Sequence, residues 1–331
     1  MNTTAVREEN YRIEKDSIGT KDVPKNVYYG VQSLRAAENF HITGLNMHPE
    51  IINSLAYIKK AAAITNCEVG LLDPVKAKAI VKACDEILSG KFHDDFIVDP
   101  IQGGAGTSLN MNANEVIANR AIEILGGRKG DYSVVNPNDD VNFGQSTNDV
   151  VPTAGKMTSL RLLKKLKAEL LRLHTTLEKK ADEFDHVIKM GRTQMQDAVP
   201  IRLGQEFKAY AAAIQRDVYR MDRAMDEMRK LNMGGTAVGT GINADKTYLR
   251  RIVPNLSEVS DMEFVQAFDL IDATQNLDGF VYVSGALKAM AVSLSKMCND
   301  LRLLSSGPKT GFEEIVLPAK QNGSSIMPGK V

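Results

Sequence analysis

Residues 287–304 read LKAMAVSLSKMCNDLRLL, and this stretch decides the fold class. Its apolar side chains recur at alternating spacings of three and four residues: Leu287, Met290, Leu294, Met297, Leu301 and Leu304. Such a seam repeats about every 3.5 residues, which is typical of long helices that pack side by side. Apolar stripes of this kind form a core far more often than a cofactor pocket. We therefore predict a core-forming bundle helix here.

Two further stretches carry nearly the same seam. The first consists of Leu163, Leu166, Leu170, Leu173 and Leu177, and the second of Leu203, Phe207, Tyr210, Ile214, Val218, Met221, Met225 and Met228. Helices of roughly 30 residues would each be about 45 Å long, which suits an antiparallel bundle. The sequence thus predicts an all-α fold with a long-helix bundle. Because these stripes are long, we expect part of each to pack on other subunits.

The first 140 residues have a different character, with shorter helices joined by polar loops. We predict helices over Pro49–Cys67, Asp73–Ser89 and Asn110–Leu125. The second opens with Asp73-Pro74 at its cap and first turn, and the third ends at Gly126-Gly127. A connection rich in Pro, Asn and Asp covers residues 132–143. We place a domain boundary there, between a small, mostly helical N-terminal domain (1–140) and a bundle domain (141–331).

The composition excludes several classes of protein. Lys+Arg and Asp+Glu both number 41, so there is no basic excess for nucleic acid or an anionic membrane. No uncharged apolar run approaches 18 residues, and the polar start disfavours a secretory signal. Cys67, Cys84 and Cys298 are widely spaced, which indicates reduced thiols and a cytoplasmic protein. The five histidines lack metal-ligand spacing, so we expect neither a metal nor a cofactor.

Four polar segments are rich in hydroxyl, amide and glycine groups. They are Gly103–Asn112, Gly144–Asp149, Gly191–Ala198 and Gly323–Val331, and we expect them to be loops that lead into helices. Glycine allows a backbone to approach a ligand, and a helix start offers N–H groups to an anion. Each segment alone is most simply explained as a helix cap. Together they suit a dicarboxylate, which needs a cradle at each end.

In this order and spacing, the four segments resemble the conserved regions of the aspartase/fumarase superfamily over essentially the whole chain. Residues 12–16, 28–40 and 298–308 are similar to this superfamily as well. The resemblance implies an all-α lyase that forms a homotetramer, in which each active site takes motifs from three chains. In the superfamily, the loop that begins at Gly323 continues beyond the residue matched by Val331. We therefore expect the C-terminal part of the bundle domain to be missing.

Within the superfamily, the aspartate ammonia-lyase family is the closest match. Gly323–Ile326, Val199-Pro200 and Leu203–Phe207 are more similar to aspartases than to class II fumarases. Fumarases carry His where this chain has Gln194, and a glutamine does not exchange a proton near neutral pH. The implied reaction is the reversible deamination of L-aspartate to fumarate and ammonia through an aci-carboxylate. Class II fumarase, a catalytically silent structural homologue such as a lens crystallin, and a plain helical scaffold remain alternatives.

The resemblance also assigns roles to residues. Ser324 matches the general base that takes the Cβ proton. Positions that match substrate contacts are Thr107, Ser146, Thr147, Asn148, Thr193, Gln194 and Ser325. Lys330 matches the anchor of a substrate carboxylate.

Overall fold

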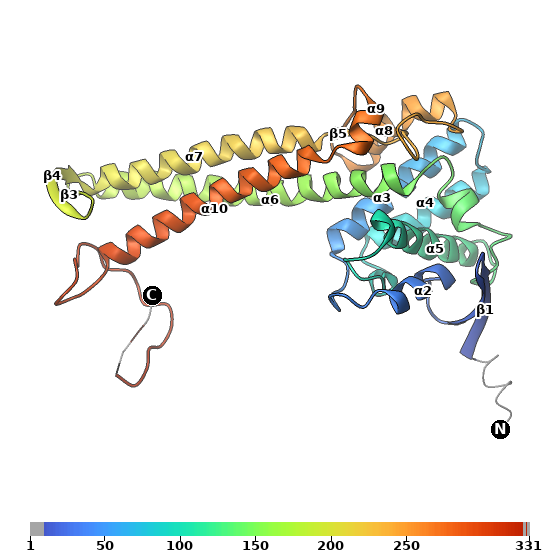
Figure 1. The fold of residues 1–331 in the computed structure, drawn as a ribbon, viewed down its shortest axis with the longest axis horizontal. Helices are drawn as coiled ribbons and strands as arrows, with labels where there is room; N and C mark the ends of the chain where they lie inside the picture. The colour runs from blue at the N-terminus through green and yellow to red at the C-terminus, as the bar shows by residue number, and fades with distance from the viewer. Residues whose placement is uncertain (1–9, 327–328, 330–331) are drawn as a thin grey trace. The chain divides into compact units, whose positions relative to one another are not determined.

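The computed structural model describes residues 10–326 and residue 329. The chain divides into two compact units (Figure 1). Unit 1 comprises Met1–Leu162 and Asp226–Asp278, and unit 2 comprises Leu163–Met225 and Gly279–Val331. The domain boundary expected near residue 140 stays a prediction. None of the helices in the described part of the chain is long and apolar enough to cross a membrane.

Unit 1 is built around a group of packed helices. These are α2 (Val31–Asn39), α3 (Pro49–Glu68), α4 (Pro74–Leu88), α5 (Thr107–Ile124) and α8 (Lys246–Ser260). Helix α3 packs against α4 and α8, and α5 packs against α4 and α2. The core contains fully buried aliphatic side chains: Ile52, Leu55, Ile58, Ile80, Ile87, Ile117 and Ile122.

The three short helices predicted from the sequence are confirmed. Asp73 caps α4 by accepting hydrogen bonds from the N–H groups of Val75 and Lys76. Helix α5 begins three residues earlier than expected, at Thr107. The Pro/Asn/Asp-rich connection contains the π-helical turn η3 (Pro137–Val141), whose first N–H groups bond to the side chain of Asn136.

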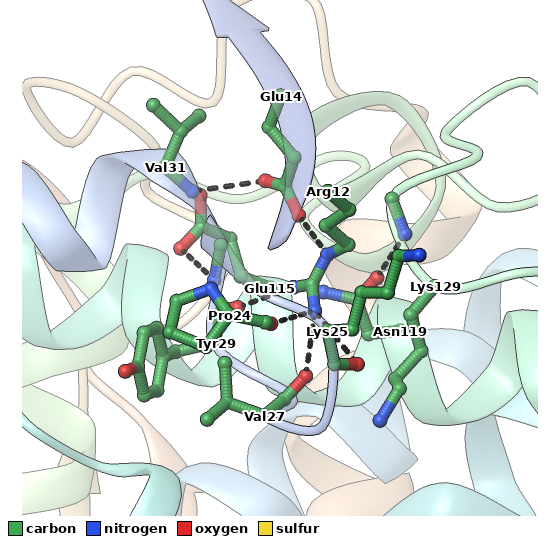
Figure 2. Close-up of polar contacts among 12 residues, drawn as sticks. Arg12, Glu14, Pro24, Lys25, Val27, Tyr29, Val31, Glu115, Asn119 and Lys129 are labelled. Atoms are coloured by element: carbon green, nitrogen blue, oxygen red, sulfur yellow. Dashed lines mark hydrogen bonds and ion pairs between the residues drawn. The ribbon is translucent and has the colours of Figure 1, made fainter. Parts of the chain in front are cut away.

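Within unit 1, a partly buried arginine holds an N-terminal hairpin in place. Strands β1 (Tyr11–Asp16) and β2 (Gly19–Pro24) pair antiparallel. The Arg12 guanidinium donates to the backbone carbonyls of Pro24 at 2.7 Å, Val27 at 2.9 Å and Tyr29 at 2.7 Å (Figure 2). It also pairs with Glu14 at 2.7 Å. One side chain thus fixes the loop between β2 and α2.

Two buried carboxylates hold the start of α2. Glu14 accepts hydrogen bonds from the Val31 N–H and the Tyr132 hydroxyl, both at 2.9 Å. Glu115 on α5 accepts from the Gly30 N–H at 2.9 Å and from both the N–H and the hydroxyl of Ser33. Negative charge at a helix N-terminus is favourable because the N–H groups there lack helical partners. Residues 12–16 and 28–40, which resemble the superfamily, thus include side chains and N–H groups that fix the start of α2.

Unit 1 also contains several small elements. Strands β5 (Lys230–Leu231) and β6 (Val265–Gln266) form a parallel pair. Helix α9 (Leu270–Gln275) is capped by Asp269. Short helical turns η1 (His93–Asp95) and η2 (Gly104–Gly106) lie before α5 in the chain.

Unit 2 is made from long helices that carry the three predicted seams. They are α6 (Thr147–Glu183), α7 (Leu203–Met228) and α10 (Asp278–Leu304), and the first half of α6 belongs to unit 1. Lys167 on α6 pairs with Asp222 on α7 at 2.5 Å, and the two helices lie side by side (Figure 1). The Tyr210 hydroxyl of α7 donates to Asp300 of α10 at 3.0 Å.

The seams differ in how fully this single chain buries them. All eight seam positions of α7 are buried. Of the six seam residues of α10, Met297 and Leu304 are buried and the other four are half-buried. The all-α fold class is confirmed. Within residues 10–326, three two-stranded sheets that were not predicted from the sequence are added to it.

Candidate functional site

The residues with predicted site roles fall into two groups. Thr107, Ser146, Thr147 and Asn148 belong to unit 1. Thr193, Gln194, Ser324 and Ser325 belong to unit 2, and Lys330 lies outside the described residues.

Thr107 stands at the start of α5 after a glycine-rich turn. Gly104, Ala105 and Gly106 all have positive φ angles, of 65°, 50° and 93°. A Cβ on Gly106 would lie 2.7 Å from a methyl carbon of Val151, so only glycine fits there. The Thr107 hydroxyl donates to the Gly104 carbonyl at 2.5 Å. The turn and the exposed Thr107 side chain are therefore held as one unit.

The second segment forms the start of α6. The N–H of Ser146 donates to Asp149 at 2.9 Å, and the Ser146 hydroxyl accepts from the N–H of Asn148 at 3.2 Å. This reciprocal arrangement is a capping box with aspartate in place of glutamate. Asp149 also accepts from the N–H groups of Gly234 at 3.1 Å and Thr236 at 3.0 Å. The capping carboxylate therefore ties the helix start to the loop after β5.

Asn148 makes a second connection to the same loop. Its side-chain amide donates to the Ala237 carbonyl at 2.7 Å, and its own carbonyl accepts from Asn232 at 3.0 Å. Thr147 is linked to α5, because the Asn110 amide points at its hydroxyl at 3.5 Å. The structure thus brings Ser146, Thr147 and Asn148 together at a helix start, where N–H groups and the helix dipole favour an anion.

A buried lysine beneath this segment was missed by the sequence analysis. Lys59 on α3 is 0% exposed. Its ammonium donates to the amide oxygens of Asn110 at 2.8 Å, Asn142 at 2.8 Å and Gln145 at 2.9 Å. The side-chain amide of Asn110 also contacts the Thr147 hydroxyl, so Lys59 is connected to the start of α6 through Asn110.

The electrostatics of this buried region are unusual. Burial lowers the pKa of the Lys59 ammonium to about 7, while the Asp149 carboxylate opposes that shift. Burial likewise raises the pKa of Asp149 to about 6, against the hydrogen bonds from Ser146, Thr236 and Gly234. Perturbed groups of this kind cluster at functional sites more often than elsewhere.

In unit 2, the third polar segment forms a hairpin, so the expectation that it leads into a helix from a loop was wrong. Strands β3 (Ile188–Thr193) and β4 (Gln196–Arg202) pair antiparallel, with Thr193 opposite Gln196. The turn residues Gln194 and Met195 have φ angles of 51° and 62°. Left-handed geometry at both positions is what a two-residue type I′ turn requires. Thr193 and Gln194 therefore stand exposed at the tip of the hairpin.

The fourth segment lies beyond α10. Ser324 and Ser325 are exposed, and Gly323 is half-buried. Among residues 10–326 and 329, no group of three or more His, Cys, Asp or Glu side chains is placed to hold a metal ion.

Comparison with known proteins identifies the family. The family model described as "Lyase" matches residues 19–331. Aspartate ammonia-lyase from Bacillus subtilis (strain 168) is 56% identical over 324 residues, which cover 98% of this chain and 68% of the relative. The enzyme of the same name from Escherichia coli (strain K12) is 49% identical over 325 residues, with 97% and 68% coverage. The chain thus spans about two thirds of the length of these relatives.

Solved structures agree with this result. A fumarate lyase/delta crystallin from Brucella melitensis matches with a TM-score of 0.95 and 50% identity, covering 97% of this chain and 70% of that one. A class II fumarase from Schistosoma mansoni matches with a TM-score of 0.93 and 39% identity, with 97% and 71% coverage. The resemblance drawn from the polar segments is confirmed. The chain belongs to the aspartase/fumarase superfamily of lyases.

Proposed function

We propose that this protein is an ammonia-lyase that reversibly converts L-aspartate into fumarate and ammonia. The observation that carries the proposal is its 49–57% identity, over almost the whole chain, to relatives named aspartate ammonia-lyase. Gln194 gives independent support. The hydration chemistry of a fumarase uses an imidazole at this position, and a glutamine amide neither accepts nor releases a proton near pH 7.

In the proposed mechanism, Ser324 removes the Cβ proton of aspartate. A serine hydroxyl is a weak base, so it needs a shielded pocket rich in hydrogen-bond donors, and closure of the segment that carries it would provide one. The proton loss leaves an aci-carboxylate with two negative charges on one carboxyl group. The C–N bond then breaks and ammonia leaves.

The start of α6 is suited to stabilise this dianion. Ser146, Thr147 and Asn148 combine hydroxyl and amide groups with the positive end of a helix dipole. Donors aimed at a developing charge typically contribute roughly two to three powers of ten in rate. Thr107, Thr193, Gln194 and Ser325 are proposed to contact the substrate as well. Lys330 is proposed to hold its second carboxylate.

We further propose a cytoplasmic homotetramer with active sites shared between chains. The half-buried seam of α10 supports assembly, because a long apolar stripe is stabilised when a second chain covers it. Cys67, Cys84 and Cys298 are all free, as is usual for proteins of a reducing compartment.

Sedimentation and a fumarate assay on the complete gene product test these proposals together. A tetramer that releases fumarate and ammonia from L-aspartate is expected. A monodisperse monomer with full activity would contradict the shared site, and strong malate dehydration without aspartate deamination would favour the class II fumarase alternative.

A further inference from the structure

A partly buried ion cluster links the β3–β4 hairpin of unit 2 to the chain that follows α10. Lys189 lies 2.7 Å from Glu314 and 2.9 Å from Glu206. Arg192 pairs with the other carboxylate oxygen of Glu314 at 2.6 Å. The side chains of Lys189 and Glu314 are only 8% and 15% exposed. We refer to Lys189, Arg192, Glu206 and Glu314 as the Glu314 cluster.

The backbone around Glu314 is fixed to the end of α10. Its N–H donates to the Leu304 carbonyl at 2.9 Å, and the N–H of Glu313 donates to the Ser306 carbonyl at 2.8 Å. The fold-back is tight at Gly311, where a Cβ would lie 2.3 Å from the carbonyl carbon of Ser306. Glu314 therefore points from a rigid turn, and its position is set by α10.

The opposite side of the cluster belongs to the hairpin. Arg192 precedes Thr193 and Gln194 directly, and its guanidinium stacks 4.2 Å from the ring centre of Phe312. Lys189 lies on the same strand, near the start of α7 where Glu206 stands. One carboxylate thus holds the hairpin at two points, three residues apart. These two ion pairs connect the strand that leads to the exposed tip with the turn after α10.

Electrostatics favour the charged forms of Glu314 and Arg192. Burial disfavours the ionised form of Glu314, but hydrogen bonds from Arg192 and Lys189 outweigh it and leave the carboxyl pKa below its ordinary value. The hydrogen bond to Glu314 raises the pKa of Arg192. Partly buried ion pairs of this kind add little net stability, because the cost of removing two charges from water offsets their attraction. A role in geometry explains them better than a role in stability.

We propose that Glu314 is a positioning residue for the lyase reaction. Through Arg192 and Lys189 it fixes the hairpin tip that presents Thr193 and Gln194. The backbone of Glu314 is bonded to the end of α10. Glu314 therefore also fixes the start of the ten-residue segment that leads to Ser324, the proposed general base. This inference rests on the proposed function, because it assumes that these two segments act on the substrate.

The test compares two neighbouring carboxylates in the complete gene product. Glu314→Gln keeps the side-chain shape and removes the charge, and the control Glu313→Gln does the same at an exposed position. Loss of a charge-assisted contact is expected to reduce kcat/KM for L-aspartate about 10- to 100-fold, mainly through kcat. Amide hydrogen exchange over residues 188–194 and 312–317 should rise together. Glu313→Gln should leave both quantities within about twofold of the wild type.

A double-mutant cycle tests whether Arg192 and Glu314 act through their mutual ion pair or independently of each other. Arg192→Gln should show a defect of the same kind, and adding it to Glu314→Gln should cost little more than Glu314→Gln alone, because Glu314→Gln already removes the Arg192–Glu314 ion pair. The proposal would be overturned if the two losses in kcat/KM multiplied in the double variant, or if amide hydrogen exchange in the hairpin did not change. It would also be overturned if Glu314→Gln lost helix content or failed to assemble. If the wild type does not deaminate aspartate, the proposed function fails, whereas the exchange measurements still test the coupling.

Discussion

Replacing Lys59 with methionine tests the support beneath the start of α6. Methionine retains most of the apolar stem and removes the ammonium group. The change deprives the amide oxygens of Asn110 and Gln145 of their donor, whereas the amide oxygen of Asn142 still accepts from the Asn110 amide at 3.2 Å. We expect the Asn110 and Gln145 amides to reorient, and Thr147 to lose its fixed position as a result. The turnover number should fall strongly, whereas the free energy of unfolding should change little.

The expected change in stability follows from two opposing contributions. Each oxygen left without a donor costs about 1–3 kcal/mol, so the two together cost about 2–6 kcal/mol. The fall in the Lys59 pKa from 10.5 to about 7 means that burying the charged form costs about 5 kcal/mol, which methionine relieves. The net effect on the free energy of unfolding therefore lies between a gain of about 3 kcal/mol and a loss of about 1 kcal/mol.

The assay measures deamination kinetics and thermal unfolding on the same samples. Loss of oriented donors near a developing charge should reduce kcat about 100-fold or more. The matched control is Lys60→Met, which removes a neighbouring lysine that pairs with Asp85 at 2.6 Å on the surface. An exposed pair of this kind is worth about 0–1 kcal/mol, so the control should remain active and stable. A Lys59→Met enzyme with near-normal kcat and KM would show that Lys59 does not hold the catalytic geometry at the start of α6.

The same variant makes a prediction about pH. The pKa of Lys59 is lower in the folded than in the unfolded chain, so the unfolded chain binds more protons between about pH 7 and 10.5. The contribution of Lys59 to stability therefore rises with pH through this window. Urea unfolding at pH 7 and pH 9 should show a smaller rise for Lys59→Met than for Lys60→Met. Equal slopes would show that Lys59 has an ordinary pKa.

Two substitutions test the predicted site residues beyond α10. Ser324→Ala should abolish most turnover while the fold and substrate affinity persist, because it removes the base and little volume. If Ser325→Ala loses turnover in steady-state assays and Ser324→Ala retains it, the base has been assigned to the wrong hydroxyl. Lys330→Met should raise KM steeply and lower kcat, since an unpaired buried carboxylate costs typically a few kcal/mol. Near-normal saturation by aspartate would place the carboxylate anchor elsewhere.

The long helices could be predicted because their signal is local. In α7 the spacing of Leu203, Phe207 and Tyr210 by itself defines a buried stripe, and all three side chains are buried. Capping signals are local as well, as Asp73-Pro74 at the start of α4 illustrates. Because the spacing of apolar residues reports only on one helix at a time, it could not show that four seam residues of α10 are only half-buried in this chain.

The hairpin that carries Thr193 could not be predicted with the same rules. Its turn places Gln194 and Met195 in left-handed geometry without the Asn or Gly that normally marks such a turn. The strands are short, and Gly191 interrupts one of them at a bulge. Pairing between β3 and β4 overrides the weak local preference.

The buried polar groups depend on contacts between distant parts of the chain. Glu115 bonds to the backbone of Gly30 and Ser33, which lie more than eighty residues earlier. No local rule predicts such a pairing. Lys59 left a weak signal, because it interrupts an apolar stripe of α3 that includes Ile52, Leu55 and Ala62. A lysine inside such a stripe requires buried acceptors, and a search for that pattern would have identified it.

Substrate choice distinguishes an aspartate ammonia-lyase from a fumarase, and a fumarate assay on two substrates measures it. The complete gene product is assayed for fumarate release, first from L-aspartate and then from L-malate. We expect reversible deamination of aspartate and negligible dehydration of malate, because Gln194 cannot perform the proton transfer of an imidazole. Robust malate dehydration alongside weak aspartate deamination would contradict the account.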